Sequence, residues 1–236
     1  MSNCDIIRKM ALYNSGMKMR VRKMSSSDFD ILLTKYNGKD ANVIIPDGVT
    51  TIGVYAFSEC ATVKEVTIPD QVKSIEYTAF WNCDNLERMK IGKGLENPSQ
   101  YGLIGDCGKF KGFEVDEDNP YLKAVDGDLY TKDGDFLYYA IGKQVETFTV
   151  PNGTKKIGPF AFFACENLHS VIIPEGVEEI GERAFDCSKV AEVIVPSTVK
   201  EIGERAMSGE NLVVKAPKGS YAIKWAKKNE VKFEII

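Results

Sequence analysis

A segment of about 23 residues recurs along the chain, and this repeat restricts the possible folds more than any other feature. Each copy reads approximately V-x-I-P-x-x-V-x-x-I-G-x-x-A-F-x-x-C. Five copies align on a proline, and these prolines are Pro46, Pro69, Pro151, Pro174 and Pro196. One copy is too short to bury its apolar side chains alone, whereas stacked copies can share a continuous core. The repeat therefore predicts a solenoid.

The pattern within one copy predicts a short strand followed by a turn. Side chains alternate along a strand, so Val66 and Ile68 should face the core while Thr67 faces outward. The proline that follows ends the strand because it lacks a backbone donor. The Ala-Phe pair then predicts a short helical turn whose phenylalanine enters the core.

Several repeat positions recur together, and in this respect residues 29–236 closely resemble the BspA-type leucine-rich-repeat family. The resemblance implies an α/β solenoid, a right-handed superhelix of about 23-residue repeats with a parallel sheet on its concave side. Many members of that family are bacterial surface or secreted proteins that mediate adhesion. The resemblance therefore implies recognition of a host or matrix partner.

Breaks in the repeat suggest how the chain is divided. Asp-Gly pairs at 126–127 and 133–134 predict β-hairpins. Near the end, Ser220 can cap a helix in which Trp225 plugs the core. We predict a basic extension over 1–28 and one solenoid domain over 29–236. The domain would contain a first repeat block (29–115), a β-hairpin insert (116–147), a second repeat block (148–210) and a C-terminal cap (211–236).

The first 27 residues carry six basic side chains against one acidic side chain, Asp5. This composition suggests a solvated or partly helical extension, with contact to a membrane surface or an acidic partner as the alternative. The segment lacks the apolar core and cleavage site of a secretory signal peptide. The expected location is thus the cell surface or outside by resemblance, and the cytoplasm if the sequence is complete.

Five of the six cysteines recur at the repeat spacing: Cys60, Cys83, Cys107, Cys165 and Cys187. We interpret them as small buried residues at one repeat position, not as disulfide partners. No C-x-x-C pair suggests a zinc site, and the aspartates of the insert lack the spacing of a calcium-binding loop. We expect no metal and no cofactor.

Composition argues against several functional classes. A net charge of −4 is unusual for a dedicated nucleic-acid binder, and no run of 18 apolar residues could span a membrane. The chain has a single histidine, His169, and no nucleophile or phosphate-binding motif. We therefore expect a protein that is not an enzyme.

The outward strand positions should form two columns on the concave sheet, a surface that solenoids use for binding. Ile172, Ile194 and Val213 would form an apolar patch there. The complete set of candidate partner-binding residues is Ile172, Ile194, Val213, Arg88, Lys90, Thr67 and Thr149. The predicted function is a monomeric, non-catalytic module that binds a protein or glycan. The alternative is an intracellular scaffold that is not exported.

Overall fold

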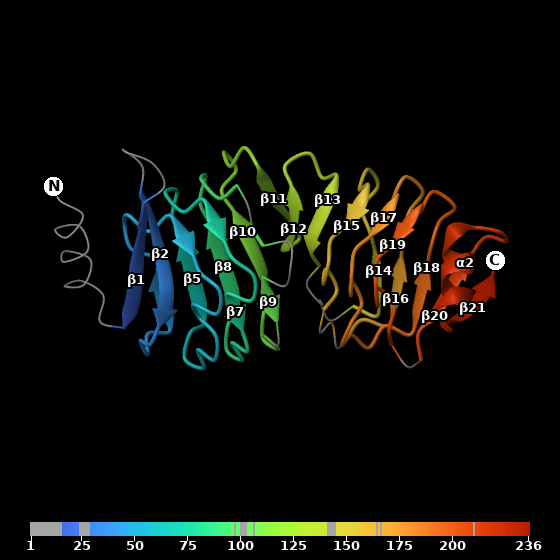
Figure 1. The fold of residues 1–236 in the computed structure, drawn as a ribbon, viewed down its shortest axis with the longest axis horizontal. Helices are drawn as coiled ribbons and strands as arrows, with labels where there is room; N and C mark the ends of the chain where they lie inside the picture. The colour runs from blue at the N-terminus through green and yellow to red at the C-terminus, as the bar shows by residue number, and fades with distance from the viewer. Residues whose placement is uncertain are drawn as a thin grey trace. The chain divides into compact units, whose positions relative to one another are not determined.

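The structure, a computed structural model, is nearly all strand and divides into two compact units between Ala124 and Val125 (Figure 1). It describes residues 16–23, 29–96, 98–99, 103–105, 107–140, 145–163, 165, 167–209 and 211–236. Each unit is a stretch of β-solenoid. Within the described ranges the only helix is α2 (Tyr221–Lys228). The described residues thus form a β-solenoid, and the α/β class that the resemblance implied is not confirmed in them.

Unit 1 contains a four-stranded parallel sheet in the order β10-β8-β5-β3. Its register aligns Val43, Val66, Met89 and Phe113, all of which are buried. In β5, Val66 and Ile68 are buried and Thr67 is not, which confirms the predicted alternation. The four strands are β3 (Asn42–Ile44), β5 (Glu65–Ile68), β8 (Arg88–Ile91) and β10 (Gly112–Val115).

A second sheet of unit 1 has the order β1-β2-β4-β6, and β7 and β9 form a short ladder. These strands are β1 (Met17–Lys23), β2 (Phe29–Tyr36), β4 (Thr51–Ile52), β6 (Ser74–Ile75), β7 (Phe80–Trp81) and β9 (Ile104–Gly105).

Strand β1 corrects our expectation for part of the basic extension. It pairs antiparallel with β2, where we had expected a solvated or partly helical segment. The sequence MKMRVRK alternates between apolar and basic residues, which is the period of a strand. Residues 1–15 and 24–28, with the rest of that prediction, lie outside the described residues.

Unit 2 also contains two sheets, and β11 (Leu122–Val125) lies at the division between the units. The first sheet has the order β14-β16-β18-β20-β21 and is parallel throughout. Its strands are β14 (Thr147–Thr149), β16 (Ser170–Ile172), β18 (Glu192–Ile194), β20 (Val213–Ala216) and β21 (Lys232–Ile235).

The second sheet of unit 2 contains the hairpin that the Asp-Gly pair at 133–134 predicted. Strands β12 (Asp128–Thr131) and β13 (Phe136–Tyr139) pair antiparallel, and Gly134 in their turn has a φ of 88°. Such a positive φ favours glycine. Three short parallel strands continue this sheet: β15 (Lys156–Ile157), β17 (Glu179–Ile180) and β19 (Glu201–Ile202).

The phenylalanine of the Ala-Phe pair enters the core, as predicted. In unit 1, the ring of Phe57 lies 4.8 Å from that of Phe80 and 5.1 Å from that of Tyr36. In unit 2, Phe162 and Phe185 stack at 4.8 Å. All four phenylalanines are fully buried. Repeated stacking of aromatic rings thus links successive turns of the solenoid within each unit.

The segment around Ala-Phe forms the predicted turn, but its backbone is not helical throughout. The residue before the alanine has a left-handed backbone in five copies, with φ between 51° and 58°: Tyr55, Thr78, Phe160, Arg183 and Arg205. A left-handed residue cannot continue a right-handed helix. The chain therefore reverses after about one turn.

The cysteine position is buried in most copies but not in all. Cys60, Cys83 and Cys165 are buried, and their thiols contact the backbone oxygens of Tyr36 (3.8 Å), Phe57 (3.0 Å) and Ala140 (3.6 Å), respectively.

Cys187 is exposed, and Cys107 is only partly buried. Cys60, Cys83 and Cys165 are each the third residue after the core phenylalanine, but in the Cys187 copy Ser188 is the third residue after Phe185. The Ser188 hydroxyl donates to the backbone oxygen of Phe185 (2.7 Å). A one-residue deletion has therefore moved Cys187 out of the buried position.

The C-terminal cap matches its prediction. Ser220 caps α2 by accepting a hydrogen bond from the backbone N–H of Ile223 (3.4 Å), and Trp225 is buried. Lys227 and Lys228 lie in the last turn of α2, where positive charge is favourable.

Candidate functional site

The first candidate surface is the outward face of the parallel sheet of unit 2, which we call the unit-2 face. Its residues are Thr147, Thr149, Ser170, Ile172, Glu192, Ile194, Val213 and Lys215. They point outward because the residues between them, Val171, Val193 and Val214, are fully buried. All residues of the unit-2 face except Ser170, which is buried, are at least partly exposed.

Two isoleucines lie side by side on the unit-2 face. Ile172 pairs with Ile194, and Thr149 and Lys215 flank them in the same column. Both isoleucines are half-buried. Their neighbours across adjacent strands cover part of each side chain and leave the rest exposed to solvent. The pair therefore forms a small apolar centre on a face whose other residues, apart from Val213, are polar.

Hydrogen-bonded polar groups lie next to this centre. The Glu192 carboxylate accepts from the Ser170 hydroxyl (2.9 Å), and it lies 2.8 Å from the Lys215 ammonium. These hydrogen bonds from Lys215 and Ser170 lower the pKa of Glu192. The hydrogen bond with Glu192 in turn raises the pKa of Lys215. Both groups thus stay charged at neutral pH.

The corresponding face of unit 1 is dominated by ion pairs. Lys90 lies 2.9 Å from Glu65, and Arg88 lies 2.6 Å from Glu114. The hydrogen bond with Glu65 raises the pKa of Lys90. Exposed ion pairs of this kind contribute little to the free energy of folding. They do give each of these charged groups a partner of opposite charge within the sheet.

The structure places the seven predicted residues as follows. Ile172, Ile194 and Thr149 share one column of unit 2, while Val213 lies in the other column, opposite Glu192. In unit 1, the strand register places Thr67 of β5 opposite Lys90 of β8 and Glu65 of β5 opposite Arg88 of β8.

Ile44, at the edge of the unit-1 sheet, is 67% exposed but was not among the predicted binding residues.

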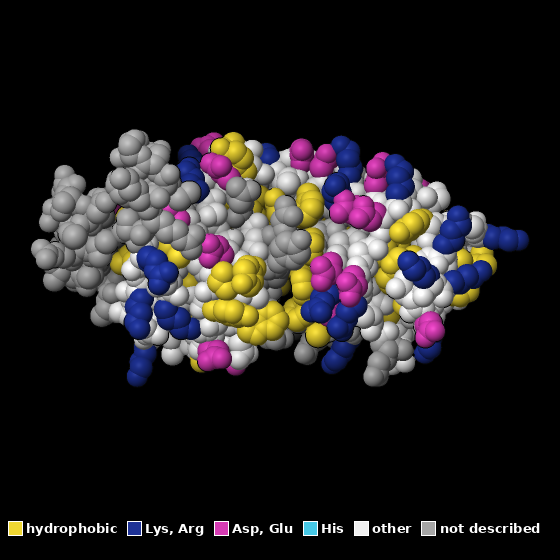
Figure 2. Space-filling model, viewed as in Figure 1, with side chains coloured by type: hydrophobic (Ala, Val, Ile, Leu, Met, Phe, Trp, Pro, Cys, Tyr) yellow, Lys and Arg dark blue, Asp and Glu magenta, His cyan; other side chains and the backbone are white. Residues whose placement is uncertain are grey.

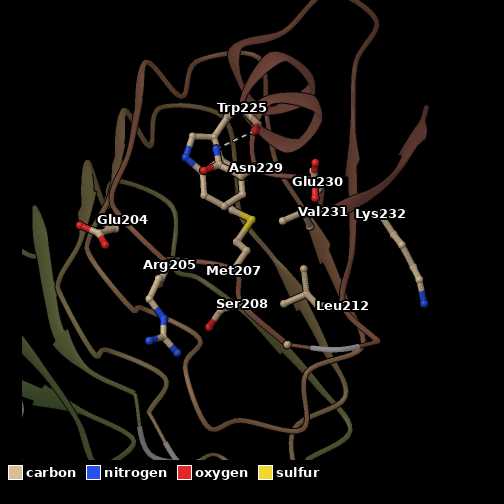
Figure 3. A pocket seen from close by; sticks show the side chains of 11 residues that line it. Glu204, Arg205, Met207, Ser208, Leu212, Trp225, Asn229, Glu230, Val231 and Lys232 are labelled. Carbon is tan, nitrogen blue, oxygen red and sulfur yellow. Dashed lines mark hydrogen bonds between the residues drawn. The ribbon is translucent and has the colours of Figure 1, made fainter.

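A second candidate is a pocket of about 500 Å³ in the C-terminal part of unit 2 (Figure 3). Met207, Leu212, Trp225 and Val231 give it apolar walls, and its charged lining residues are Glu204, Arg205, Glu230 and Lys232. The Asn229 amide donates to the backbone oxygen of Trp225 (2.8 Å) and fixes the end of α2. Sequence analysis missed this pocket because its walls come from a turn, a helix end and a strand start.

Metal and membrane sites have no support within the described ranges. No group of histidine, cysteine, aspartate or glutamate side chains there could hold a metal ion. No helix in the same residues is long and apolar enough to cross a bilayer.

Comparison with known proteins identifies the family. The family model of the BspA-type leucine-rich repeat region matches in six copies, over residues 35–119 and 134–218. The chain belongs to this family. No curated protein matches this BspA-type repeat protein in sequence.

Solved structures of bacterial leucine-rich repeat proteins are similar to the BspA-type chain. One from Eubacterium ventriosum has a TM-score of 0.55 and 18% identity, with 87% of this chain and 71% of that chain covered. The leucine-rich repeat protein of T. pallidum has a TM-score of 0.43 and 21% identity, with 92% and 95% covered. At 18% identity, the first likeness supports the fold alone.

Proposed function

We propose that this BspA-type repeat protein is a non-catalytic binding module that recognises a protein or glycan through the unit-2 face. The observation that carries the proposal is the paired, partly buried Ile172 and Ile194 beside the hydrogen-bonded group of Glu192, Ser170 and Lys215. In this proposal the sheet is the concave side of a right-handed solenoid, and the role is adhesin-like at the cell surface or outside the cell.

An apolar centre with a polar surround is the usual composition of a recognition surface. The isoleucines supply apolar area that a partner can cover. The polar groups beside them are already hydrogen-bonded to one another, so they are held in place before a partner arrives. The residues predicted in unit 1, Arg88, Lys90 and Thr67, would contribute charge and polarity to a larger contact.

The test is a double variant in which Ile172→Thr and Ile194→Thr remove the apolar centre. Threonine suits a strand, and Thr149 already occupies the same column, so the fold should be retained. The purified chain is screened by surface plasmon resonance against host matrix proteins and a glycan array. We expect the double variant to lose about tenfold or more in affinity for any ligand found, as buried isoleucines contribute on the order of 1 kcal/mol each.

The matched control is Ile44→Thr, which makes the same change in the outward column of unit 1. Its affinity should equal that of the unchanged chain. Full affinity in the double variant, with a circular dichroism spectrum like that of the unchanged chain, would contradict recognition through the unit-2 face. Loss in the Ile44 variant alone would assign recognition to unit 1 instead.

A second candidate function is a scaffold in a reducing compartment, and the buried thiols favour it. Cys60, Cys83 and Cys165 form no disulfides, and thiols persist where reductants are present. Labelling of intact cells with an antibody distinguishes the two candidates. A surface signal supports the adhesin-like role, whereas a signal that appears only after the cells are permeabilised supports the scaffold.

A further inference from the structure

Strand β21 has an outer edge that no strand of the described residues covers. It is the last strand of its sheet, and all four of its residues are exposed. Phe233 is 38% exposed and Ile235 is 49% exposed. Figure 2 shows hydrophobic side chains among lysines and arginines at the end of the molecule where α2 and β21 lie. An uncovered edge of this kind can pair with another strand.

The backbone N–H and C=O groups of successive residues in β21 point alternately toward β20 and toward the outer edge. The N–H of Ile236 donates to the backbone oxygen of Ala216 and so points toward β20 (3.2 Å). Because these groups alternate along a parallel strand, those of Phe233 and Ile235 point to the outer edge. Phe233 can therefore exchange two hydrogen bonds with an antiparallel strand.

We propose that the strand that pairs with this edge is β21 of a second copy of the chain. The two strands would run antiparallel about a two-fold axis at Phe233, a self-complementary arrangement. In this register, Phe233 lies opposite Phe233 of the partner subunit. Lys232 lies opposite Glu234 of the partner subunit, and the symmetry makes this contact twice.

Charge favours the register centred on Phe233 over the register whose two-fold axis is moved by one residue. Moving the two-fold axis by one residue would place Glu234 opposite Glu234 of the partner subunit, and like charges in that position repel. The register centred on Phe233 instead places opposite charges at the closely spaced, non-hydrogen-bonded positions of an antiparallel pair. The sequence Lys-Phe-Glu is therefore complementary to itself.

A row of charges that crosses the sheet of unit 2 also supports a second copy of the chain as the partner. Glu192, Lys215 and Glu234 alternate in sign on β18, β20 and β21, and Lys215 lies 2.8 Å from Glu192 and 3.5 Å from Glu234. The row ends at β21 on a negative charge. Lys232 of the partner subunit would continue the alternation by one strand.

The size of the contact predicts a weak association. A pair of four-residue strands covers less area than the roughly 1,200–2,000 Å² of a stable interface. We therefore expect a monomer–dimer equilibrium that depends on protein concentration. The predicted C-terminal cap (211–236) would then be the site of association, and the predicted monomer would be one side of this equilibrium.

The experiment is sedimentation velocity on the 236-residue chain over a range of concentrations, with two single charge reversals and their combination. Lys232→Glu places two glutamates opposite each other, and Glu234→Lys places two lysines there. Each single variant should raise the dissociation constant of the dimer by about tenfold or more. The double variant restores opposite charges, so its dissociation constant should lie within about threefold of that of the unchanged chain. Lys218→Glu, an exposed change outside β21, is the matched control and should have no effect.

Disulfide trapping tests the register independently, in a background with Cys4→Ser and Cys187→Ser. The Cα atoms of a hydrogen-bonded antiparallel pair lie about 5.5 Å apart, within the range of a disulfide. Phe233→Cys should therefore form a covalent dimer under oxidation, and Glu234→Cys should not. A chain that stays monomeric at every concentration, a double variant that does not recover, or trapping at 234 instead of 233 would overturn the proposal.

Discussion

At the scale of single residues, the repeated cysteine is a link between successive turns of the solenoid. Each buried thiol reaches a backbone oxygen of the preceding turn, as Cys165 does with Ala140 (3.6 Å). Burial raises the pKa of Cys60 to about 11 and that of Cys165 to about 12. The hydrogen bond with Cys107, followed by burial, also raises the pKa of Cys83. These thiols therefore stay protonated at neutral pH.

Cys187 is exposed, whereas the buried cysteines have raised pKa values, and we therefore predict that Cys187 reacts faster with thiol reagents than they do. In a Cys4→Ser chain, Cys187 should react with Ellman's reagent at pH 8 well before Cys60, Cys83 or Cys165. At a pKa of about 11 only on the order of one thiol in a thousand is ionised at pH 8, and the thiolate is the reactive form. Cys187→Ser should abolish the fast phase. Equal labelling rates at Cys187 and Cys165, measured by peptide mass spectrometry, would contradict the assignment.

At the scale of elements, the strands of the repeat and the β12–β13 hairpin could be predicted, but the turn before Ala-Phe and strand β1 could not. Alternating apolar residues before a proline identified strands such as β5, because burial on one face leaves a period of two in the sequence. The turn before Ala-Phe has left-handed residues at Tyr55, Thr78 and Arg183. None of these is the glycine or asparagine that usually marks this conformation, so no local pattern of residues indicates it. Packing of the solenoid imposes the conformation instead.

One buried amide organises the start of β11. Asn119 is fully buried, and its side-chain oxygen accepts from the backbone N–H groups of Tyr121 and Leu122 (2.8 Å each). Its amide nitrogen donates to the backbone oxygen of Gly92 (2.7 Å), in the loop after β8. The side chain thus ties together two segments that are distant in sequence.

Replacing this side chain should be costly. Asn119→Ala removes the partner of two backbone donors and of two backbone acceptors, the oxygens of Gly92 and Leu95, so we expect a loss of about 2–4 kcal/mol in the free energy of unfolding. Asn85→Ala, which removes an exposed amide that donates to Ala61, should cost under about 1 kcal/mol. Urea denaturation followed by circular dichroism provides both values. Equal costs would show that Asn119 has no special structural role.

At the scale of the whole molecule, sequence reasoning reached the sheet faces but not the other candidate surfaces. Ile172 and Ile194 could be placed in one column because the repeat fixes which residues align. The pocket near Trp225 and the edge of β21 depend on how a turn, a helix and a strand converge after folding. No pattern within a single copy of the repeat encodes that convergence.

The two faces also predict how binding should respond to salt. If the isoleucine pair dominates recognition, raising the ionic strength from about 0.05 M to 0.3 M should change the affinity by less than about threefold, because salt screens charges and not apolar contacts. A larger loss, measured by isothermal titration calorimetry with the ligand found in the screen, would favour the charged groups of the unit-1 face, Arg88 and Lys90. The double isoleucine variant measured in parallel separates these two outcomes.

The position of Cys187 has a consequence for engineering the chain. One residue is missing after Phe185, yet Phe185 still stacks on Phe162 and the strands on both sides keep their register, with Val171 opposite Val193 and Ile180 opposite Ile202. The loop that follows Phe185 tolerates a change of length because it lies outside the two sheets to which these parallel strand pairs belong. It is therefore a suitable place to graft a foreign loop, such as an epitope, while the scaffold beneath remains intact.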